Sequence, residues 1–172
     1  MSCLCRLEIP FKRFTPNGRP VPTITIRLAN ADKITSVQCV IDSGADYCTF
    51  PIATGMMLGI NFNKVAPKEV RQQWGVINKM SSERFNELIE DAIKNKYVIP
   101  TCFRCACGTD TEAFYYPITI EIEKKFREEV LAVWNTKNTP ALLGRFGAFN
   151  KIKKITFKKG ETLILDFKNK ND

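Results

Sequence analysis

The sequence of 172 residues contains no histidine. Without imidazole the chain cannot build a Ser-His-Asp or Cys-His nucleophile pair, a His-Glu-x-x-His zinc site, or any other mechanism that uses histidine as the base. Proton transfer near neutral pH must then fall to carboxylates, lysine, cysteine or tyrosine. The absence excludes several large classes of hydrolase and leaves carboxylate chemistry open.

Long apolar runs and low-complexity stretches are also missing. No stretch reaches the roughly 18 apolar residues of a membrane span. Glu8 and Lys12 lie where the apolar run of a signal peptide would be. Apolar residues make up 44% of the chain and charged residues 26%, close to the average of a soluble globular protein. We therefore expect a single domain over residues 1–172 that is cytoplasmic and makes no contact with membranes.

The seven cysteines are an odd number, which indicates free thiols in a chain without an export signal. Cys102, Cys105 and Cys107 form a Cys-x-x-Cys-x-Cys cluster. With no histidine, a zinc site would need four thiolate or carboxylate ligands, and no second Cys-x-x-Cys pair exists. We expect no metal and no cofactor, with the cluster as the lesser alternative. Cys39 and Cys48 lie in apolar runs and are expected in the core.

The net charge of +8 is concentrated at the C-terminal end, where residues 151–172 hold seven lysines and three acidic residues. A basic tail can indicate nucleic-acid binding. A basic nucleic-acid-binding β module is therefore one interpretation, but nucleic acid is the less favoured partner, because the lysines alternate with apolar residues as on the solvent face of a sheet. Those apolar residues are Ile152, Ile155, Phe157, Leu163, Leu165 and Phe167.

Short apolar segments separated by turns make up most of the sequence. In residues 23–30 the apolar side chains recur at every second position, the pattern of a half-buried strand. Residues 7–11 and the turn segment 15–20 suggest an antiparallel hairpin that leads into this strand. The pattern predicts an all-β barrel or sandwich. Further strands are expected at residues 37–41, 117–123, 130–134 and 162–167.

One segment has the spacing of a helix instead. Between residues 80 and 96 the apolar side chains fall on one stripe of an amphipathic helix, with Ser81 or Ser82 as the N-cap. The flanking residues 66–75 and 95–100 resemble connections. We interpret residues 66–100 as an insertion into a β domain. The stripe consists of Phe85, Leu88, Ile89, Ala92 and Ile93.

A candidate for chemistry lies in residues 40–51, Val-Ile-Asp-Ser-Gly-Ala-Asp-Tyr-Cys-Thr-Phe-Pro. An apolar strand delivers Asp42 into a tight turn made by Ser43, Gly44 and Ala45. An aspartate at the end of a buried strand costs free energy unless it is hydrogen-bonded or used. The glycine allows another backbone to approach closely. An ordinary Asp-Ser-Gly β-turn is the alternative interpretation.

A second string, Pro-Ala-Leu-Leu-Gly-Arg-Phe-Gly-Ala-Phe, occupies residues 140–149. Together the two strings resemble the retropepsin-like (retroviral-type) aspartic proteases, and most of all their prokaryotic single-domain relatives. The resemblance covers residues 20–62 and 110–167 and not the insertion. It implies a closed, mostly antiparallel acid-protease barrel with one short C-terminal helix in addition to the inserted amphipathic helix.

The resemblance also implies a homodimeric aspartic endopeptidase, in which two copies of Asp42 meet at a twofold axis. Carboxylates so close share one proton, and the ionised one activates a water that hydrolyses a peptide bond of an extended substrate. The pair titrates as a unit, so activity should favour acidic to near-neutral pH. By the same resemblance, the N-terminal segment and residues 164–167 belong to the dimer interface.

Other positions take their roles from the family as well. Ser43 would hydrogen-bond across the axis, Gly44 would offer its carbonyl to the substrate, and Asp46 and Arg145 would form an ion pair that supports the loop. Considered without the family, Asp46 and Arg145 are two surface charges. The hydrophobic-hydrophobic-Gly segment that packs beside the loop corresponds to Leu142, Leu143 and Gly144.

The flap is where the chain departs from the family. Retropepsin flaps are usually glycine-rich at the tip, as a mobile hairpin requires, whereas the candidate segment 105–114 contains a single glycine. This departure keeps open an alternative function: a catalytically weak or inactive dimer that serves as a peptide-binding or assembly module. The candidate tip residues are Cys107, Gly108, Thr109 and Asp110.

Overall fold

The computed structural model describes residues 5–12, 18–75, 80–104, 108, 110–137, 139–158 and 161–167. Strands dominate these residues and helices are few, as the sequence predicts. The strands are β1 (Cys5–Pro10), β2 (Thr23–Asn30), β3 (Lys33–Ile41), β4 (Thr49–Pro51), β5 (Ile99–Arg104), β6 (Asp110–Ile122), β7 (Phe126–Asn135), β8 (Ala141–Leu143), β9 (Ile152–Lys158) and β10 (Thr162–Phe167).

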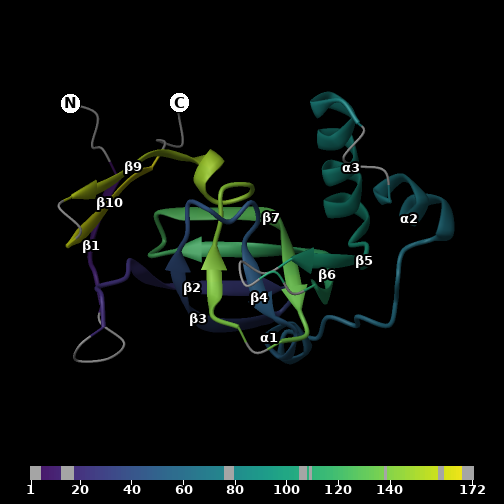
Figure 1. The fold of residues 1–172 in the computed structure, drawn as a ribbon, viewed down its shortest axis with the longest axis horizontal. Coiled ribbons are helices and arrows are strands. Elements are labelled where there is room, and N and C mark those ends of the chain that lie inside the picture. Colours follow the sequence, from purple (N-terminus) through teal and green to yellow (C-terminus); the bar gives the residue numbers. More distant parts are fainter. Residues whose placement is uncertain are drawn as a thin grey trace.

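A seven-stranded sheet forms the centre of the molecule (Figure 1). Its strands follow the order β2-β3-β8-β4-β7-β6-β5, and β2 pairs with β6 in addition. The β3–β8 and β4–β7 pairs are parallel, whereas β2–β3, β5–β6 and β6–β7 are antiparallel. The sheet is therefore mixed rather than clearly antiparallel. The end of β3 belongs to one of these parallel pairs, in which Ile41 lies opposite Leu143 of β8.

The first and last strands form a separate sheet of order β1-β10-β9 at one end of the molecule (Figure 1). The predicted hairpin that leads into β2 is seen at the antiparallel Lys12–Val21 pair, but not along residues 7–10, because β1 pairs along its whole length with β10. This register sets Leu7 opposite Leu165 and Ile9 opposite Leu163. Pairing with β10 keeps these apolar side chains together over the core, and the bridge from Lys12 to Val21 links the first segment to the residues that lead into β2.

The buried apolar residues fall into two clusters. The main cluster lies within the strands of both sheets and contains Trp134, Phe50 and Leu143, each fully buried. The second cluster lies between the large sheet and the helices. It contains Trp74 and Leu88 from the helices and residues of β5, β6 and β7 from the sheet. Strand β7 contributes to both clusters because its successive side chains point to opposite faces and both faces are covered.

The predicted amphipathic helix is confirmed as α3 (Ser82–Asn95). The Ser81 side chain caps it by accepting a hydrogen bond from the Arg84 N–H at 3.3 Å, and the helix ends at Lys96, whose φ of 54° is left-handed. Leu88 and Ala92 bury its apolar stripe in the second cluster. The side chains on this stripe fix which face of α3 meets the sheet.

The flanks of this helix are not the plain connections that the sequence indicates. Residues 68–74 form the short helix α2 (Lys68–Trp74), which begins after Pro67 and anchors itself by burying Trp74. Residues 99 and 100 already belong to β5. Another short helix, α1 (Ile52–Met57), and a 3₁₀ turn at Phe149–Lys151 complete the described helices. No helix in the described ranges is long and apolar enough to cross a membrane.

Candidate active site

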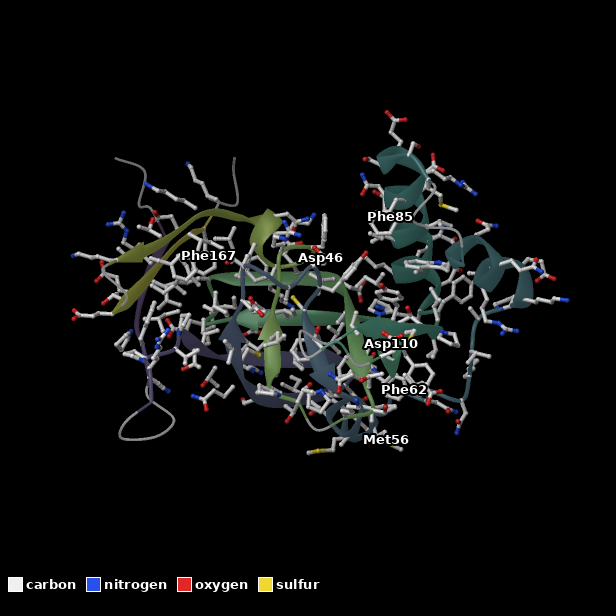
Figure 2. All side chains as sticks on the ribbon, in the orientation of Figure 1. Asp46, Met56, Phe62, Phe85, Asp110 and Phe167 are labelled. Atoms are coloured by element: carbon white, nitrogen blue, oxygen red, sulfur yellow. The ribbon has the colours of Figure 1, made fainter. Side chains whose placement is uncertain are left out.

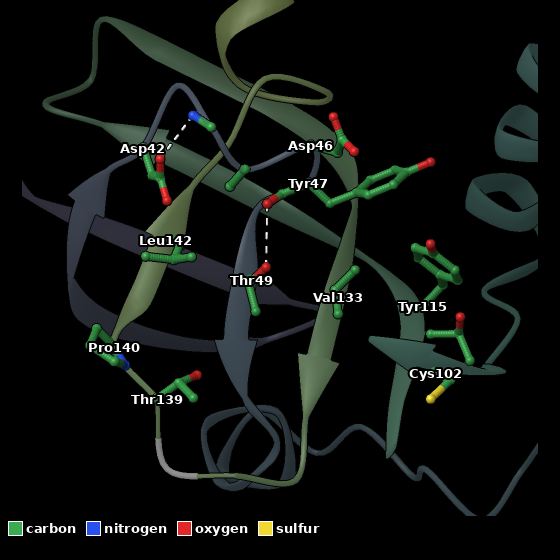
Figure 3. A pocket seen from close by; sticks show the side chains of 13 residues that line it. Asp42, Asp46, Tyr47, Thr49, Cys102, Tyr115, Val133, Thr139, Pro140 and Leu142 are labelled. Carbon is green, nitrogen blue, oxygen red and sulfur yellow. Dashed lines mark hydrogen bonds between the residues drawn. The ribbon is translucent and has the colours of Figure 1, made fainter. Parts of the chain in front are cut away.

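Asp42 follows directly on the last residue of β3. Its N–H donates to the Leu143 carbonyl at 3.1 Å, which continues the parallel β3–β8 pairing by one residue. Its side-chain Oδ1 accepts a hydrogen bond from the Gly44 N–H at 2.8 Å (Figure 3). The carbonyl of Asp42 accepts from the Ala45 N–H at 3.2 Å. The half-buried carboxylate is therefore fixed in a tight turn, while Ser43 and Gly44 are exposed at its tip.

Strand β8 lies between β3 and β4 and brings the two sequence strings together. Leu143 is fully buried in the main cluster, whereas Leu142 points to the other side and lines a cleft. At Gly144 the backbone comes so close to the loop that a Cβ would lie 2.4 Å from the Tyr47 carbonyl oxygen. Only glycine fits there without a shift of backbone. The structure thus places the predicted Leu-Leu-Gly segment against the Asp42 loop.

The next two residues, Arg145 and Phe146, make further hydrogen bonds between the two segments. The Arg145 N–H donates to the Ala45 carbonyl at 2.9 Å, and the Phe146 N–H donates to the Asp46 carbonyl at 2.6 Å. The Arg145 guanidinium also pairs with the Asp46 carboxylate, as expected from the sequence. The two side chains are 57% and 58% exposed, so solvent screens their attraction. In the single chain, the backbone hydrogen bonds carry more of this link than the charges do.

A cleft of about 560 Å³ opens beside Asp42. One wall is the loop from Asp42 to Tyr47, and the opposite wall includes Thr101 and Cys102 of β5 (Figure 3). Leu142 and Val133 add apolar surface. A concave, largely apolar hollow with a few polar groups is the usual form of a ligand site.

The candidate flap is the connection between β5 and β6, and this hairpin contributes to the cleft through β5. Its last described pair sets Arg104 opposite Asp110. Gly108 has a φ of 80° and open space around it, a conformation that glycine adopts without strain. Cys107 and Thr109 lie outside the described residues.

The cysteine cluster is described only in part. Cys102 is exposed and lines the cleft, whereas Cys105 and Cys107 lie outside the described residues. In the ranges that are described, no three cysteine or acidic side chains gather in a way that could hold a metal ion. Cys39 and Cys48 are fully buried, as predicted, and burial raises the pKa of Cys48 to about 11. A thiol so buried is inert at neutral pH.

Two tyrosines at the cleft have no counterpart in the sequence prediction. Tyr47 follows Asp46 in the loop, and its ring meets the Tyr115 ring edge to face at 5.2 Å between centroids. Burial is the main cause that raises the pKa of both hydroxyls, so both stay protonated and can donate hydrogen bonds. The alternating pattern of β6 places Tyr115 on a strand and could have been read from the sequence. Its contact with Tyr47 arises only from the fold.

No protein-family model matches the chain, and no curated protein matches it by sequence. In structure the chain is similar to a retropepsin-like aspartic protease from Rickettsia conorii, with a TM-score of 0.54. The match covers 94% of this chain and 92% of that chain at 15% sequence identity. The chain therefore has a retropepsin-like fold, which confirms the fold family that the two strings predict.

Proposed function

We propose that this protein is an aspartic endopeptidase that is active as a homodimer. The observation that carries the proposal is the Asp42 carboxylate, held by the Gly44 N–H at the edge of a peptide-sized cleft on a retropepsin-like fold. The lack of histidine excludes the main alternative bases for hydrolysis. Asp46 also lines the cleft, but Arg145 engages it. Asp42 is thus the carboxylate available for catalysis among the described residues of the cleft.

A second carboxylate would come from an identical protomer. A twofold contact repeats every residue, so one exposed Ser43-Gly44 turn that meets its own copy brings two Asp42 side chains together. Two carboxylates in contact cannot both ionise cheaply and share one proton. The ionised Asp42 takes a proton from a water as its oxygen attacks the scissile carbonyl carbon, and the protonated Asp42 gives its proton to the carbonyl oxygen. The tetrahedral intermediate then breaks its C–N bond as the first Asp42 passes its proton to the leaving amine nitrogen and the second takes back the hydroxyl proton, which restores the shared-proton pair.

The family resemblance assigns the N-terminal segment and residues 164–167 to the dimer interface. In the single chain, β10 has β1 on one side and β9 on the other. A strand of a second protomer can add only at the outer edge of β1 or of β9. We therefore place the essential contact at the Ser43-Gly44 turns, with the three-stranded sheet as a supporting surface.

The substrate in this proposal is an extended peptide. A chain in this conformation offers backbone hydrogen bonds along its length and sends alternate side chains into pockets. The cleft supplies a strand, β5, on one side and the apolar side chains of Leu142 and Val133 on the other. The β5–β6 hairpin then serves as the lid that excludes water from the bond to be cut.

The test compares wild type with Asp42→Asn and with the control Asp32→Asn, which makes the same change in the exposed turn between β2 and β3. Denatured casein is incubated with each protein from acidic to neutral pH. We expect cleavage by wild type and the control, and loss of at least a thousandfold in Asp42→Asn, because the nucleophilic water loses its base. Equal cleavage by all three proteins would reject Asp42 as the catalytic residue.

A mixing experiment tests the shared site. If each site needs two copies of Asp42, adding excess Asp42→Asn protein to wild type removes activity as mixed dimers form, and Asp32→Asn protein does not. Sedimentation should show a dimer under the conditions of activity. Wild type that stays monomeric while it cleaves would reject the dimer. Peptide binding without cleavage by wild type would favour the alternative, a peptide-binding module.

A further inference from the structure

A second hollow, of about 340 Å³, adjoins the cleft on the side of α3. It lies between the first turn of this helix and the loop that carries Asp42. Asp46, Tyr47 and Tyr115 line both hollows, so the two adjoin along this edge. Figure 2 shows Asp46 and Phe85 on the elements that face each other across it.

Four aromatic residues line this second hollow together with polar groups. Tyr47, Tyr115, Phe85 and Phe146 all contribute, and the hydroxyls of Ser81 and Ser82 add polar atoms at its rim. Its one acidic group, Asp46, is already paired with Arg145. Rings that meet edge to face or at a tilt favour another ring as a neighbour. The chemistry fits an aromatic side chain better than a cation.

The wall formed by α3 is fixed relative to the catalytic loop. The rings of Tyr47 and Tyr115 are 5.2 Å apart, those of Tyr115 and Trp74 are 5.1 Å apart, and those of Trp74 and Phe85 are 6.4 Å apart. This chain of contacts runs from the loop through α2 to α3. Because Trp74 is buried in the second cluster, the hollow exists before any ligand binds.

We propose that this hollow is a distal specificity subsite, in which Tyr47 and Phe85 hold an aromatic side chain of the same extended substrate that occupies the cleft. The inference rests on the proposed function. The occupant follows from adjacency, because Asp46, Tyr47 and Tyr115 line both the cleft and the hollow, so an extended peptide in the cleft passes beside the hollow. An extended chain advances roughly 3.3 Å per residue, so the side chain concerned lies a few residues from the scissile bond.

The experiment uses peptides built around a cleavage site determined with wild type. Each position from the second to the fifth residue on either side of the scissile bond is substituted, one position at a time, by Tyr, Phe, Arg or Gly. We expect one position at which Tyr and Phe give a kcat/KM about tenfold higher than Gly, and Arg does not. The Phe85→Ala protein should lose that preference and keep its rate on the Gly peptide. Phe85→Trp, which fills the hollow, should lose it too.

Phe157→Ala is the matched control, because it removes the same side chain from a half-exposed position on β9. It should keep the preference, and thermal unfolding should show all variants folded. An equal loss on all peptides in Phe85→Ala, or no aromatic preference in wild type at any position, would overturn the subsite. If wild type cleaves nothing, the proposed function fails, and calorimetric binding of extended casein-derived peptides that carry Tyr or Gly at one varied position decides the subsite: equal affinity for the Tyr and Gly peptides at every position rejects it.

Discussion

The chain has two tryptophans, and each lies at the centre of a different cluster. Trp134 is fully buried among Phe50 and Phe62, and its Nε1–H donates to the Tyr116 carbonyl at 3.1 Å. Trp74 is buried as well, but among the described residues its Nε1–H has no partner. In the main cluster the indole N–H is thus satisfied by a backbone carbonyl, whereas in the second cluster the indole is held by packing without a hydrogen bond.

The difference reflects how each cluster is built. Strands alternate their side chains, so Val133 faces the second cluster while its neighbour Trp134 faces the main one. The main cluster therefore positions β3 and β8, which carry Asp42 and Leu143. The second cluster places α3 beside Tyr47. One cluster holds the chemistry and the other shapes one wall of the site.

The largest effect is expected at Gly144, where the Asp42 loop joins the main cluster. In Gly144→Ala the new Cβ would lie 2.4 Å from the Tyr47 carbonyl and 2.9 Å from that of Ala45. Because backbone must move, we expect a loss of about 3 kcal/mol in the free energy of unfolding, measured in urea. Gly75→Ala is the control, since Gly75 has helical φ and ψ and should tolerate alanine within about 0.5 kcal/mol.

The two tryptophans give a matched pair of smaller effects. Trp134→Phe leaves the Tyr116 carbonyl without its side-chain donor and opens a void, so we expect a loss of about 2 kcal/mol. Trp74→Phe loses no hydrogen bond and should cost under about 1 kcal/mol. Urea unfolding followed by circular dichroism measures both. Equal losses of stability in the two variants would show that the two clusters are stabilised in the same way.

The smallest effect is expected for the ion pair between Asp46 and Arg145, which lies where the two clusters meet the loop. Both side chains are more than half exposed, so a double-mutant cycle with Asp46→Asn and Arg145→Gln should give a coupling energy under about 1 kcal/mol. The backbone hydrogen bonds of Arg145 and Phe146 remain in these variants. A coupling above about 2 kcal/mol in the isolated chain would show that the charges, and not the backbone, carry the link.

The parts predicted correctly are those with a local pattern. The period of two gives β2 and β10, the stripe with Ser81 before it gives α3, and the two strings give the loop and the segment that packs on it. The parts predicted wrongly depend on partners far along the chain. The partner of β1 is β10, 160 residues away at the Arg6–Asp166 pair, and no local signal indicates it.

The helix α2 shows a related limit. Its seven residues are too few for a periodic signal, and the buried Trp74 anchors it in the second cluster. Tyr115 is similar: its strand is evident in the sequence, but its contact with Tyr47 arises only when β6 and the loop come together. These contacts, which no local pattern encodes, form the wall of the proposed subsite.

By itself the sequence determined which side chains are available for chemistry. The absence of histidine, the Asp-Ser-Gly-Ala turn at the end of an apolar strand, and the downstream Leu-Leu-Gly-Arg are properties of neighbouring residues. The tertiary structure decided what surrounds Asp42: which strand lies beside it, which aromatic rings extend its cleft, and which edges stay open to a second protomer. These features depend on contacts between residues far apart in the sequence, which form when apolar faces are buried against one another. The free energy that favours this arrangement comes from the whole chain and not from any local segment.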